Sequence, residues 1–569
     1  MRTFRLIFLL VFAVVLLASG CGGDDDPSTS SGQADDDNDT GDDPADDDAD
    51  DDDVTDDDDS VDADWYRRVV FMEIFVRSYA DSDGDGIGDL PGLTARLPYL
   101  AQLGVGALWL TPIYPTPFVD SGYDVADYTA INPDYGTMDD FLAFLARAHE
   151  LGLHVFLDGV FNHTSDRHEW FLASRSSRDD PKRDWYVWAD EPLFRCPAEA
   201  SGVEEMDWAY DEATGQYYWH HFRAGMPDLN WANPEVHEAI AEVMRFWLDL
   251  GVDGFRLDVA HLYYEDATTC THHPLTHEIH SEFRALLDEY GDRAMVGELI
   301  GSPQEMAAYY GDGDDELHMV LNFNLTYALF GAHHLARPDI LADTLDASLS
   351  AMPAGGQNTV FFSNHDFYRT FDLLLRDEVR MKQMAALQLA LPGTPFIYYG
   401  EEVGMADGRE VVTDYRDAAR TPMHWTGDDN AGFTTGDPWI NLAPNYRTHN
   451  VADEAGEPAS LLNHYRRLLA LRNATKPLQT GAYREWAAGD PLAFAFFRGN
   501  DERAVLAAFN FSSEPQTLRL NFAASPWGGL TGAVRDVIAD EAYPLLDADN
   551  ADDYRFALPG RGYALLTVE

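Results

Sequence analysis

The feature that most constrains this chain is a repeated alternation of short apolar runs and amphipathic helical patterns, which begins after residue 64. Eight runs are strand candidates, and most are almost continuously apolar, as expected for strands buried on both faces of a parallel sheet. These runs occupy residues 69–75, 107–110, 154–157, 254–257, 294–296, 318–323, 359–362 and 396–399. Apolar residues recur at helical spacing between them, for example at 138–151 and 235–250. The pattern predicts an α/β fold, a (β/α)8 TIM barrel with insertions.

The rest of the sequence predicts how the barrel is extended. We expect the catalytic barrel over residues 65–480. The gap between the third and fourth strand candidates is too long for a plain crossover and is rich in Trp, Tyr and Asp, so an inserted subdomain is expected at about 164–226. Short strand patterns separated by turns predict an all-β sandwich domain over 481–569.

The N-terminus has the pattern of an export signal. Arg2 and Arg5 precede an apolar run at 6–18, and small residues lead to Cys21. This resembles a bacterial lipoprotein signal, which implies removal of residues 1–20 and a lipid on Cys21. The alternative is an ordinary secretory signal with a chance cysteine. We therefore expect an extracytoplasmic protein held to a bacterial membrane through its lipid anchor only, with the outer membrane or cell surface favoured.

The segment that follows the signal is extremely acidic. Residues 22–64 contain 22 Asp and neither Lys nor Arg. Such a segment cannot bury a core, so we predict that 21–64 is a disordered tether, and loose attraction of calcium is the alternative role. The whole chain has 38 Lys and Arg against 100 Asp and Glu, a net charge of -62. This charge excludes most nucleic-acid binders. Adaptation to high salt and the codon bias of a GC-rich genome both stay open as causes.

Three cysteines are too few for a disulfide scaffold or a four-cysteine zinc site. If the chain is exported, Cys196 and Cys270 are candidates to pair in an oxidising compartment.

Polar residues end several of the apolar runs, where barrel enzymes carry their catalytic side chains. The four segments read DGVFNH (158–163), GFRLD (254–258), GE (297–298) and SNHD (363–366). The strand period of two places Arg256 and Asp258 on one face. Two carboxylates flanking an acetal are what glycoside hydrolysis requires, and a neighbouring arginine favours the ionised form of the carboxylate that attacks.

These segments, in this order, resemble the α-amylase superfamily of retaining glycoside hydrolases, and the resemblance runs from about Trp65 to the C-terminus. Further matching blocks are WLTPIY (109–114), DSGYD (120–124), MPDLN (226–230) and GTPFIYYGEE (393–402). In motif style the chain is most similar to oligo-1,6-glucosidases, α-glucosidases and intermediate MPDLN members. The resemblance implies that Asp258 is the nucleophile, Glu298 the acid/base and Asp366 the stabiliser of the transition state.

The same resemblance implies a set of substrate-binding residues. They are Asp120, Tyr123, His163, Arg256, His365, Arg369, Arg416 and Arg420. Arg256 is expected to orient the nucleophile, and Tyr123 to stack on the first sugar. In exo-acting relatives Asp120 and one arginine cap this subsite, and whether the arginine is Arg416 or Arg420 stays open. The alternative for each residue is a polar side chain that only packs.

The loop DSDGDGIGD at 81–89 places carboxylates at alternate positions, which is calcium chemistry. It is not an EF-hand, because Gly92 stands where that loop needs Glu. It resembles the calcium loop of oligoglucosidase-like members, which implies one structural Ca2+ and no organic cofactor. The implied ligands are Asp81, Asp83, Asp85, the Ile87 carbonyl and Asp89. An acidic surface turn is the alternative.

The expected activity is retaining hydrolysis of α-glucosidic bonds in starch-derived malto- and isomalto-oligosaccharides. Val259 after the nucleophile and the block RDAARTPMHW (416–425) favour small oligosaccharides, whereas Met226 in place of the usual Gln leaves an endo-acting α-amylase open. A transglycosylase, such as a trehalose synthase or glucanotransferase, is the alternative enzyme. An inactive carbohydrate-binding or transporter-partner protein is the alternative of another class, disfavoured because all three carboxylates are present.

Overall fold

The computed structural model describes residues 63–196, 207–312, 315–486, 491–499, 504–522 and 531–568. The predicted signal peptide, Cys21 and almost all of the predicted tether lie outside these residues. Within them, none of the helices combines the length and the apolar character that a membrane crossing needs.

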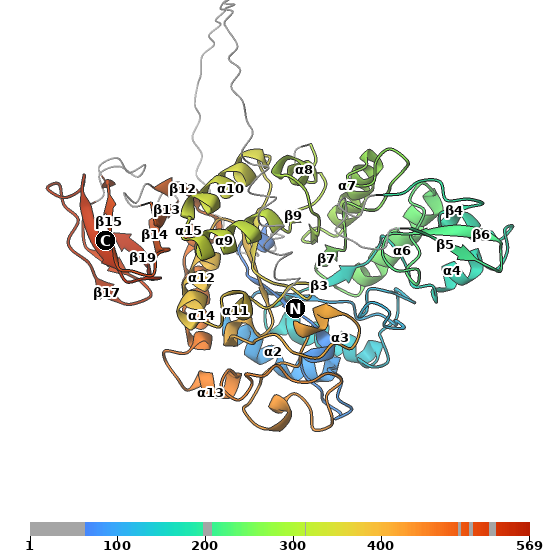
Figure 1. Ribbon diagram of the computed structural model, residues 1–569, viewed down its shortest axis with the longest axis horizontal. Coiled ribbons are helices and arrows are strands. Elements are labelled where there is room, and N and C mark those ends of the chain that lie inside the picture. Colours follow the sequence, from blue (N-terminus) through green and yellow to red (C-terminus); the bar gives the residue numbers. More distant parts are fainter. Residues whose placement is uncertain are drawn as a thin grey trace, which may run out of the picture. The chain divides into compact units, whose positions relative to one another are not determined.

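Eight parallel strands form the central sheet (Figure 1), which confirms the predicted barrel. They are β1 (Phe71–Ile74), β2 (Ala107–Leu110), β3 (His154–Gly159), β7 (Gly254–Leu257), β8 (Ala294–Gly297), β9 (Met319–Val320), β10 (Thr359–Phe361) and β11 (Thr394–Tyr398). Each overlaps one of the eight predicted runs. The hydrogen-bonded order is β10-β11-β1-β2-β3-β7-β8-β9. A parallel bridge between Met319 and Gln357 brings the two edge strands together and closes the barrel.

Helices follow the strands in alternation. The α-helices outside the inserted segment are α2 (Leu90–Leu103), α3 (Met138–Glu150), α6 (Pro234–Asp249), α7 (Pro274–Asp288), α8 (Pro303–Ala308), α9 (Phe323–Leu335), α10 (Pro338–Ala351), α11 (Thr370–Leu373), α12 (Glu378–Ala390), α13 (Val451–Ala455), α14 (Leu461–Ala474) and α15 (Lys476–Thr480). Short 3-10 helices are η1 (Trp65–Arg67), η2 (Val76–Ser78), η3 (Arg183–Trp185), η4 (Glu401–Val403), η5 (Tyr415–Ala418) and η6 (Asp429–Gly432). Capping residues determine where several helices begin: Thr137 forms a capping box at the N-terminus of α3, and Asn233 caps α6 ahead of a proline.

Large apolar side chains fill the barrel interior. Phe71 stacks on Phe396 with ring centroids 4.6 Å apart, and Phe156 packs edge-on against Phe71 at 5.0 Å. Trp109, Val296 and Phe361 belong to the same buried cluster. The barrel is therefore a packed core, and its chemistry is confined to the rim.

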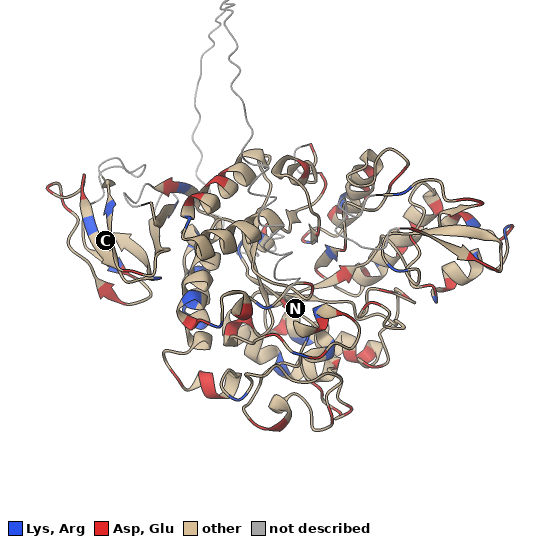
Figure 2. Ribbon diagram, viewed as in Figure 1, with Lys and Arg blue, Asp and Glu red and all other residues tan. Residues whose placement is uncertain are grey.

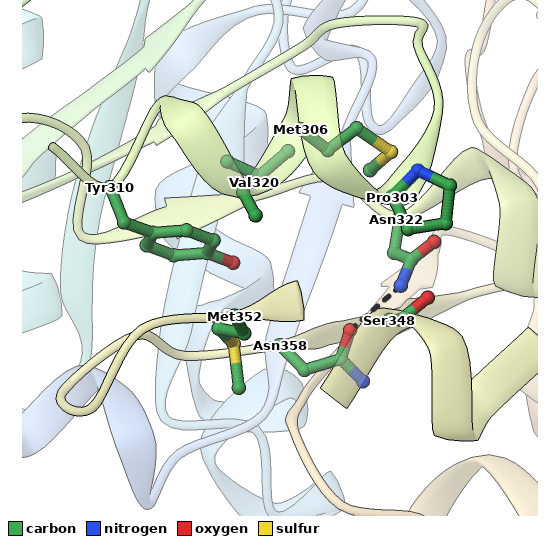
Figure 3. Close-up of a pocket in the computed structure, with 9 residues that line it drawn as sticks. Pro303, Met306, Tyr310, Val320, Asn322, Ser348, Met352 and Asn358 are labelled. Atoms are coloured by element: carbon green, nitrogen blue, oxygen red, sulfur yellow. Dashed lines mark hydrogen bonds between the residues drawn. The ribbon is translucent and has the colours of Figure 1, made fainter. Parts of the chain in front are cut away.

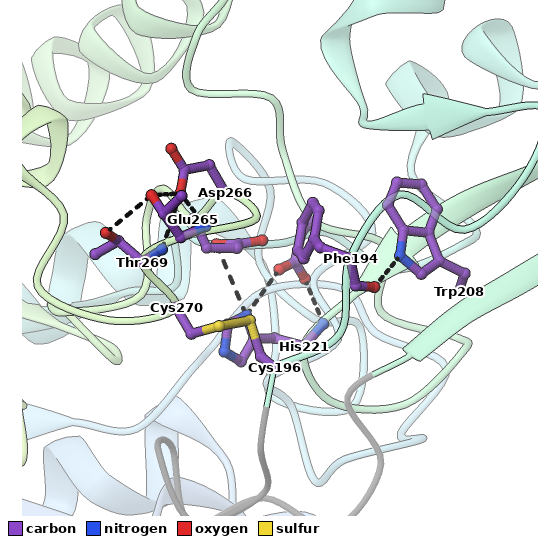
Figure 4. The surroundings of a disulfide bond; sticks show 10 residues. Phe194, Cys196, Trp208, His221, Glu265, Asp266, Thr269 and Cys270 are labelled. Atoms are coloured by element: carbon purple, nitrogen blue, oxygen red, sulfur yellow. Dashed lines mark hydrogen bonds and ion pairs between the residues drawn. A yellow bond between two sulfur atoms is a disulfide. The ribbon is translucent and has the colours of Figure 1, made fainter.

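The segment between β3 and α6 carries a small sheet of its own. Strands β4 (Trp188–Ala189), β5 (Asp207–Asp211) and β6 (Gln216–His220) pair antiparallel in the order β4-β6-β5, after α4 (Glu169–Ser174) (Figure 1). A disulfide joins Cys196 of this inserted subdomain to Cys270, in the loop between β7 and α7 (Figure 4). The inserted subdomain is thereby linked covalently to the loop that follows Asp258.

The C-terminal strands form antiparallel sheets. They are β12 (Ala482–Trp486), β13 (Ala493–Gly499), β14 (Ala504–Asn510), β15 (Gln516–Leu520), β16 (Val534–Asp536), β17 (Glu541–Ala542), β18 (Tyr554–Leu558) and β19 (Tyr563–Val568). Six pair in the order β12-β13-β14-β19-β16-β17, and β15 pairs with β18. Side chains from both sheets, such as Leu506 and Leu518, share one apolar core. This is the all-β sandwich expected after the barrel.

Two buried arginines bind the end of α12, and one of them, Arg498, comes from the C-terminal domain. Arg498 of β13 donates hydrogen bonds to the carbonyl oxygens of Ala390 and Leu391 at 2.9 and 2.7 Å. Arg472 of α14 reaches the Leu389 carbonyl at 2.9 Å. The last carbonyls of an α-helix have no partner within the helix. Arg498 and Arg472 therefore complete the end of α12.

Acidic residues occur on both helices and loops across the described part of the chain (Figure 2).

Candidate active site

The three predicted catalytic carboxylates stand just beyond three barrel strands. Asp258 follows β7, Glu298 follows β8, and Asp366 lies in the loop after β10. One buried guanidinium joins the first two: Arg256 donates from Nη1 to Asp258 Oδ1 at 2.7 Å and from Nη2 to Glu298 Oε2. A single rigid fork thus holds both carboxylates at one end of the barrel.

The backbone after Asp258 is strained. Val259 has a φ of 39°, in the left-handed region that a β-branched side chain rarely adopts. Its N–H lies 3.5 Å from Glu298 Oε2, and the next N–H, of Ala260, donates to the Glu298 carbonyl at 2.7 Å. Through these contacts, the strained turn that follows β7 is held against Glu298. Strain of this kind is commonly retained at functional sites.

Burial makes the carboxyl groups of Asp258 and Glu298 weaker acids than usual. It raises the pKa of Asp258 to about 6, although Arg256 acts in the opposite direction. Burial also raises the pKa of Glu298 to about 7, again against the charge of Arg256. At near-neutral pH the pair therefore offers one carboxylate that ionises more readily and one carboxylic acid that keeps its proton more readily. This is the division of roles that acid-assisted nucleophilic attack needs.

Asp158, at the end of β3, is buried and accepts hydrogen bonds from several residues of the site. Its Oδ1 accepts from Arg256 at 2.7 Å, and its Oδ2 accepts from the Tyr123 hydroxyl at 2.8 Å and from Trp109 Nε1 at 3.1 Å. Asp158 was quoted within a motif but not assigned a role from the sequence. Its contacts show that it fixes the positions of Arg256 and Tyr123.

His365 lies between two carboxylates. Its Nδ1 is 2.7 Å from Glu73 Oε1, and its Nε2 is 3.2 Å from Asp366 Oδ2. Although burial opposes it, the charge of Asp366 and the hydrogen bonds raise the pKa of His365 to about 9. The ring stacks on Tyr123, with centroids 4.9 Å apart and an interplanar angle of 9°. Glu73 was missed, although it is the one charged residue in the apolar strand β1.

The structure distinguishes the two arginines that the sequence left open. Arg416 pairs with Asp120 through Nη2 and lies 3.1 Å from Asp366 Oδ1 through Nη1. Arg420 instead donates to Asp366 Oδ1 at 2.9 Å and to Ser121 Oγ at 2.7 Å. Although burial acts against it, the charges of His365 and Arg416 hold the pKa of Asp366 well below its usual range. The arginine that meets Asp120 is therefore Arg416.

The remaining two predicted substrate-binding residues, His163 and Arg369, are also buried. His163 Nε2 is 3.1 Å from the Tyr123 carbonyl, and burial lowers the pKa of His163, which favours its neutral form. Arg369 donates to the Tyr399 carbonyl at 2.7 Å, and its guanidinium lies over the Tyr399 ring. Within the described residues, no ion pair joins Arg369 to the three carboxylates.

The 81–89 loop brings together three of its five implied calcium ligands. Carboxylate oxygens of Asp81, Asp83 and Asp89 lie within 4.8 Å of one another. Asp85 is not part of this group of three, and its Oδ1 accepts from the Ile87 N–H at 2.8 Å. Three hard oxygen donors at this spacing fit a calcium ion. The loop also needs Gly86, where a Cβ would lie 1.9 Å from the Asp437 carbonyl.

A second group of donor atoms was not found from the sequence. His221, Asp228 and Glu265 offer ligand atoms within 4.8 Å of one another, next to the disulfide (Figure 4). His221 is fully buried, and neither of its ring nitrogens makes a hydrogen bond. His221 directly follows β6, Asp228 lies in the MPDLN block and Glu265 lies in the loop after Asp258. These three segments have no metal-ligand spacing in the sequence. They too could hold a divalent metal ion.

A separate small cavity lies against β9, away from these groups. Its lining includes Met306, Tyr310 and Met352, and a hydrogen bond of 2.9 Å joins Asn322 to Asn358 at its edge (Figure 3). None of the three catalytic carboxylates lines it. It is therefore a packing defect of the barrel wall rather than part of the site.

Comparison with known proteins agrees with this geometry. The family description "Alpha amylase, catalytic domain" matches residues 73–481. The chain is 37% identical to the trehalose synthase/amylase TreS of Mycolicibacterium smegmatis, over 88% of this chain and 92% of that protein. It is 38% identical to a probable α-glucosidase of Rhizobium meliloti, over 81% and 91% of the two chains. It is 36% identical to a probable oligo-1,6-glucosidase of Bacillus subtilis, over 79% and 91%.

A solved structure shares the fold as well. The trehalulose synthase MutB of Pseudomonas mesoacidophila MX-45 superposes with a TM-score of 0.78 at 31% sequence identity, covering 89% of this chain and 99% of that one. The similarity therefore includes the C-terminal sandwich as well as the barrel.

Proposed function

Because this chain belongs to the α-amylase family of glycosidases, we propose that it hydrolyses α-glucosidic bonds in starch-derived malto- and isomalto-oligosaccharides with retention of configuration. One observation carries the proposal: a single buried guanidinium, that of Arg256, holds both Asp258 and Glu298 at one end of the barrel. An inactive binding protein would have no need of such a pair.

The reaction has two steps. Asp258 attacks the anomeric carbon and forms an ester bond, while the glycosidic bond breaks and Glu298 gives its proton to the departing oxygen. Glu298, now ionised, takes a proton from water, whose oxygen attacks the same carbon and breaks the ester. Asp366, kept ionised by Arg416 and His365, accepts hydrogen bonds from ring hydroxyls. Tyr123 stacks against the same sugar.

We propose that the enzyme acts from chain ends. The pair of Arg416 and Asp120 stands beside Asp366, where it would bind the outer hydroxyls of a terminal glucose. An end wall of this kind hinders a chain that continues past the first sugar.

The proposal is tested by replacing Asp258 with Asn and following maltose, isomaltose and maltoheptaose by chromatography. Wild-type protein should release glucose first from all three, and the variant should lose about 10⁴-fold or more in kcat. Asp288→Asn, on the exposed face of α7, is the matched control. Turnover of maltose by Asp258→Asn at the wild-type rate would rule out the mechanism.

Transglycosylation is the second candidate, because the TreS relative is named a trehalose synthase/amylase. It uses the same covalent intermediate, with a sugar hydroxyl in place of water. Incubation with maltose separates the two: hydrolysis yields only glucose, whereas transfer yields a new disaccharide or trisaccharide.

We propose that the 81–89 loop binds one structural calcium ion through Asp81, Asp83 and Asp89. Bound calcium would supply charge compensation for clustered carboxylates and hold the loop closed.

We further propose export and lipid attachment at Cys21, with residues 22–64 as a spacer. Cys21→Ser should move the protein from the membrane fraction to the soluble fraction of the cell envelope.

A further inference from the structure

A second arginine reaches the carboxylates that hold Arg416. Arg223 Nη2 lies 3.1 Å from Asp414 Oδ2 and 4.0 Å from Asp120 Oδ1. Arg416 binds the same two carboxylates through its own Nη2. Two guanidiniums thus converge on two carboxylates, and we call these four side chains the rim cluster. Its members come from three segments: the inserted subdomain, the loop after β11 and the loop after β2.

Burial orders the rim cluster from inside to outside. The side chain of Asp120 is 10% exposed, that of Asp414 16% and that of Arg416 19%. Arg223 is 39% exposed and is therefore the outermost member. It is the most solvent-exposed member and is within 4.0 Å of Asp120, which pairs with Arg416.

The backbone of Arg223 is held independently of the rim cluster. It sits at the start of a turn in which the Met226 N–H donates to the Arg223 carbonyl at 2.8 Å. The Gly225 carbonyl in the same turn accepts from the Asp166 N–H at 2.8 Å. These bonds lie within the inserted subdomain and do not need the guanidinium. Only the side chain of Arg223 crosses to Asp414.

Asp414 is also held without Arg223. Its Oδ1 accepts from the Arg416 N–H at 2.8 Å, and its own N–H donates to Asp417 Oδ2 at 3.1 Å at the start of η5. Its side chain remains paired with Arg416 when Arg223 is removed. Loss of Arg223 should therefore open the outer rim and leave the Asp120–Arg416 pair in place.

We propose that Arg223 determines chain-length specificity by closing the outer rim of the first subsite against α-glucans that continue past it. The inference rests on the proposed function, in which Asp120 and Arg416 bind a terminal glucose. A continuing chain would have to displace Arg223 from Asp414 and Asp120. Arg223 touches other protein side chains rather than reacting atoms, so it acts as a positioning residue.

The alternative role for Arg223 is to anchor the inserted subdomain. An anchor of this kind would leave the choice of substrate unchanged and lower the melting temperature only slightly, because partly exposed ion pairs contribute little to stability. Arg178 provides the matched control. It belongs to the same subdomain and pairs with Asp190 at 3.0 Å, with side chains 50% and 75% exposed. It has no contact with the rim cluster among the described residues.

The experiment compares full-length wild type, Arg223→Ala, Arg223→Lys and Arg178→Ala on maltose and maltoheptaose. It measures kcat and KM separately, together with the first products and the melting temperature. For Arg223→Ala we expect kcat/KM for maltoheptaose relative to maltose to rise about threefold to fivefold, the range for loss of one partly exposed ion pair. The rise should come from KM, and mid-sized fragments should accompany glucose. Arg223→Lys should lie between wild type and Arg223→Ala, because it keeps the charge without the fork.

Each other outcome decides against the inference. A wild type that cleaves both substrates, with the same ratio and products in Arg223→Ala, would overturn it and leave the proposed function intact. Failure of Arg223→Ala to fold while Arg178→Ala folds would assign Arg223 an anchoring role instead. A wild type that leaves both substrates unchanged would overturn the proposed function and this inference together.

Discussion

The Nη1 atom of Arg256 lies 2.7 Å from the Oδ1 atom of Asp258. The guanidinium is completely buried, and arginine remains charged even there. Its charge opposes the effect of burial on Asp258 and so keeps the ionised, nucleophilic form within reach at neutral pH. The contact therefore connects the fold of strand β7 directly to reactivity.

Replacement of Arg256 by Lys should lower kcat about 100-fold, because one ammonium group cannot bridge the carboxylates that the fork holds. The pKa of Asp258 should rise, and the acidic limb of the pH–rate profile should move to higher pH. Arg256→Leu should in addition destabilise the protein by about 3–5 kcal/mol, since it leaves buried carboxylates without a counter-charge. Steady-state kinetics across pH and chemical denaturation measure these effects. An unchanged acidic limb in Arg256→Lys would contradict the role given to this arginine.

The rate should depend on pH as a narrow bell. Activity should rise as pH increases through about 6, where Asp258 loses its proton, and fall as pH increases through about 7, where Glu298 loses the proton it must donate. Both limbs are expected near neutral pH because burial raises the pKa of both carboxyl groups. The measurement is kcat/KM for maltose against pH.

An aryl glucoside with a good leaving group provides the control for this profile. The aryl group leaves with little proton transfer from Glu298. The alkaline limb of the pH–rate profile should therefore flatten, while the acidic limb should remain. A rate on maltose that keeps increasing to pH 9 would show that Glu298 is not the acid.

Loss of the Cys196–Cys270 disulfide should lower the stability of the inserted subdomain. The two cysteines are 74 residues apart in the sequence, and opening a loop of this size costs about 4 kcal/mol in the chain-entropy description. The double variant Cys196→Ser/Cys270→Ser should therefore melt at a lower temperature than the wild type. Reductant should lower the melting temperature of the wild type alone. Equal melting of oxidised wild type and double variant would argue against the cross-link.

Removal of calcium should destabilise the protein more than it changes its chemistry. With calcium at about 100 times its dissociation constant, binding adds about 2.7 kcal/mol, which EDTA would remove. Asp83→Asn should abolish the difference between EDTA and calcium in thermal melting, whereas the exposed Asp139→Asn, on α3, should retain it. The rate on maltose at low temperature should persist in EDTA. A melting temperature that is identical with calcium and EDTA would count against the site.

The barrel could be predicted from the sequence because its strands are buried on both faces. Strand β7 agrees with its predicted apolar run, and α3 and α6 end within a residue of their predicted ends. The short strand β17 at the edge of its sheet gives no such signal, because its two residues are too few to show a period of two. Edge strands of this kind resemble turns when only composition and periodicity are considered.

The sequence predicts those parts of the candidate site whose positions follow from the order of the strands along the chain. The three carboxylates follow apolar strands, so topology alone places them at one end of the barrel. The choice between Arg416 and Arg420 could not be made, because both lie in one short segment and only packing shows which faces Asp120. Likewise, His221 and Glu265 meet through a fold that joins distant segments, and neither has a neighbour that signals the contact.

Arg498 satisfies carbonyl groups at the end of α12 from a strand more than one hundred residues further along the chain. During synthesis, the turn between α12 and β11 therefore leaves the ribosome well before its hydrogen-bonding partner has been made. A chain that ends at residue 481 lacks this donor, so we expect its barrel to be less stable than that of the full-length protein. The sandwich thus acts as a late-arriving clamp on a helix end that was made much earlier.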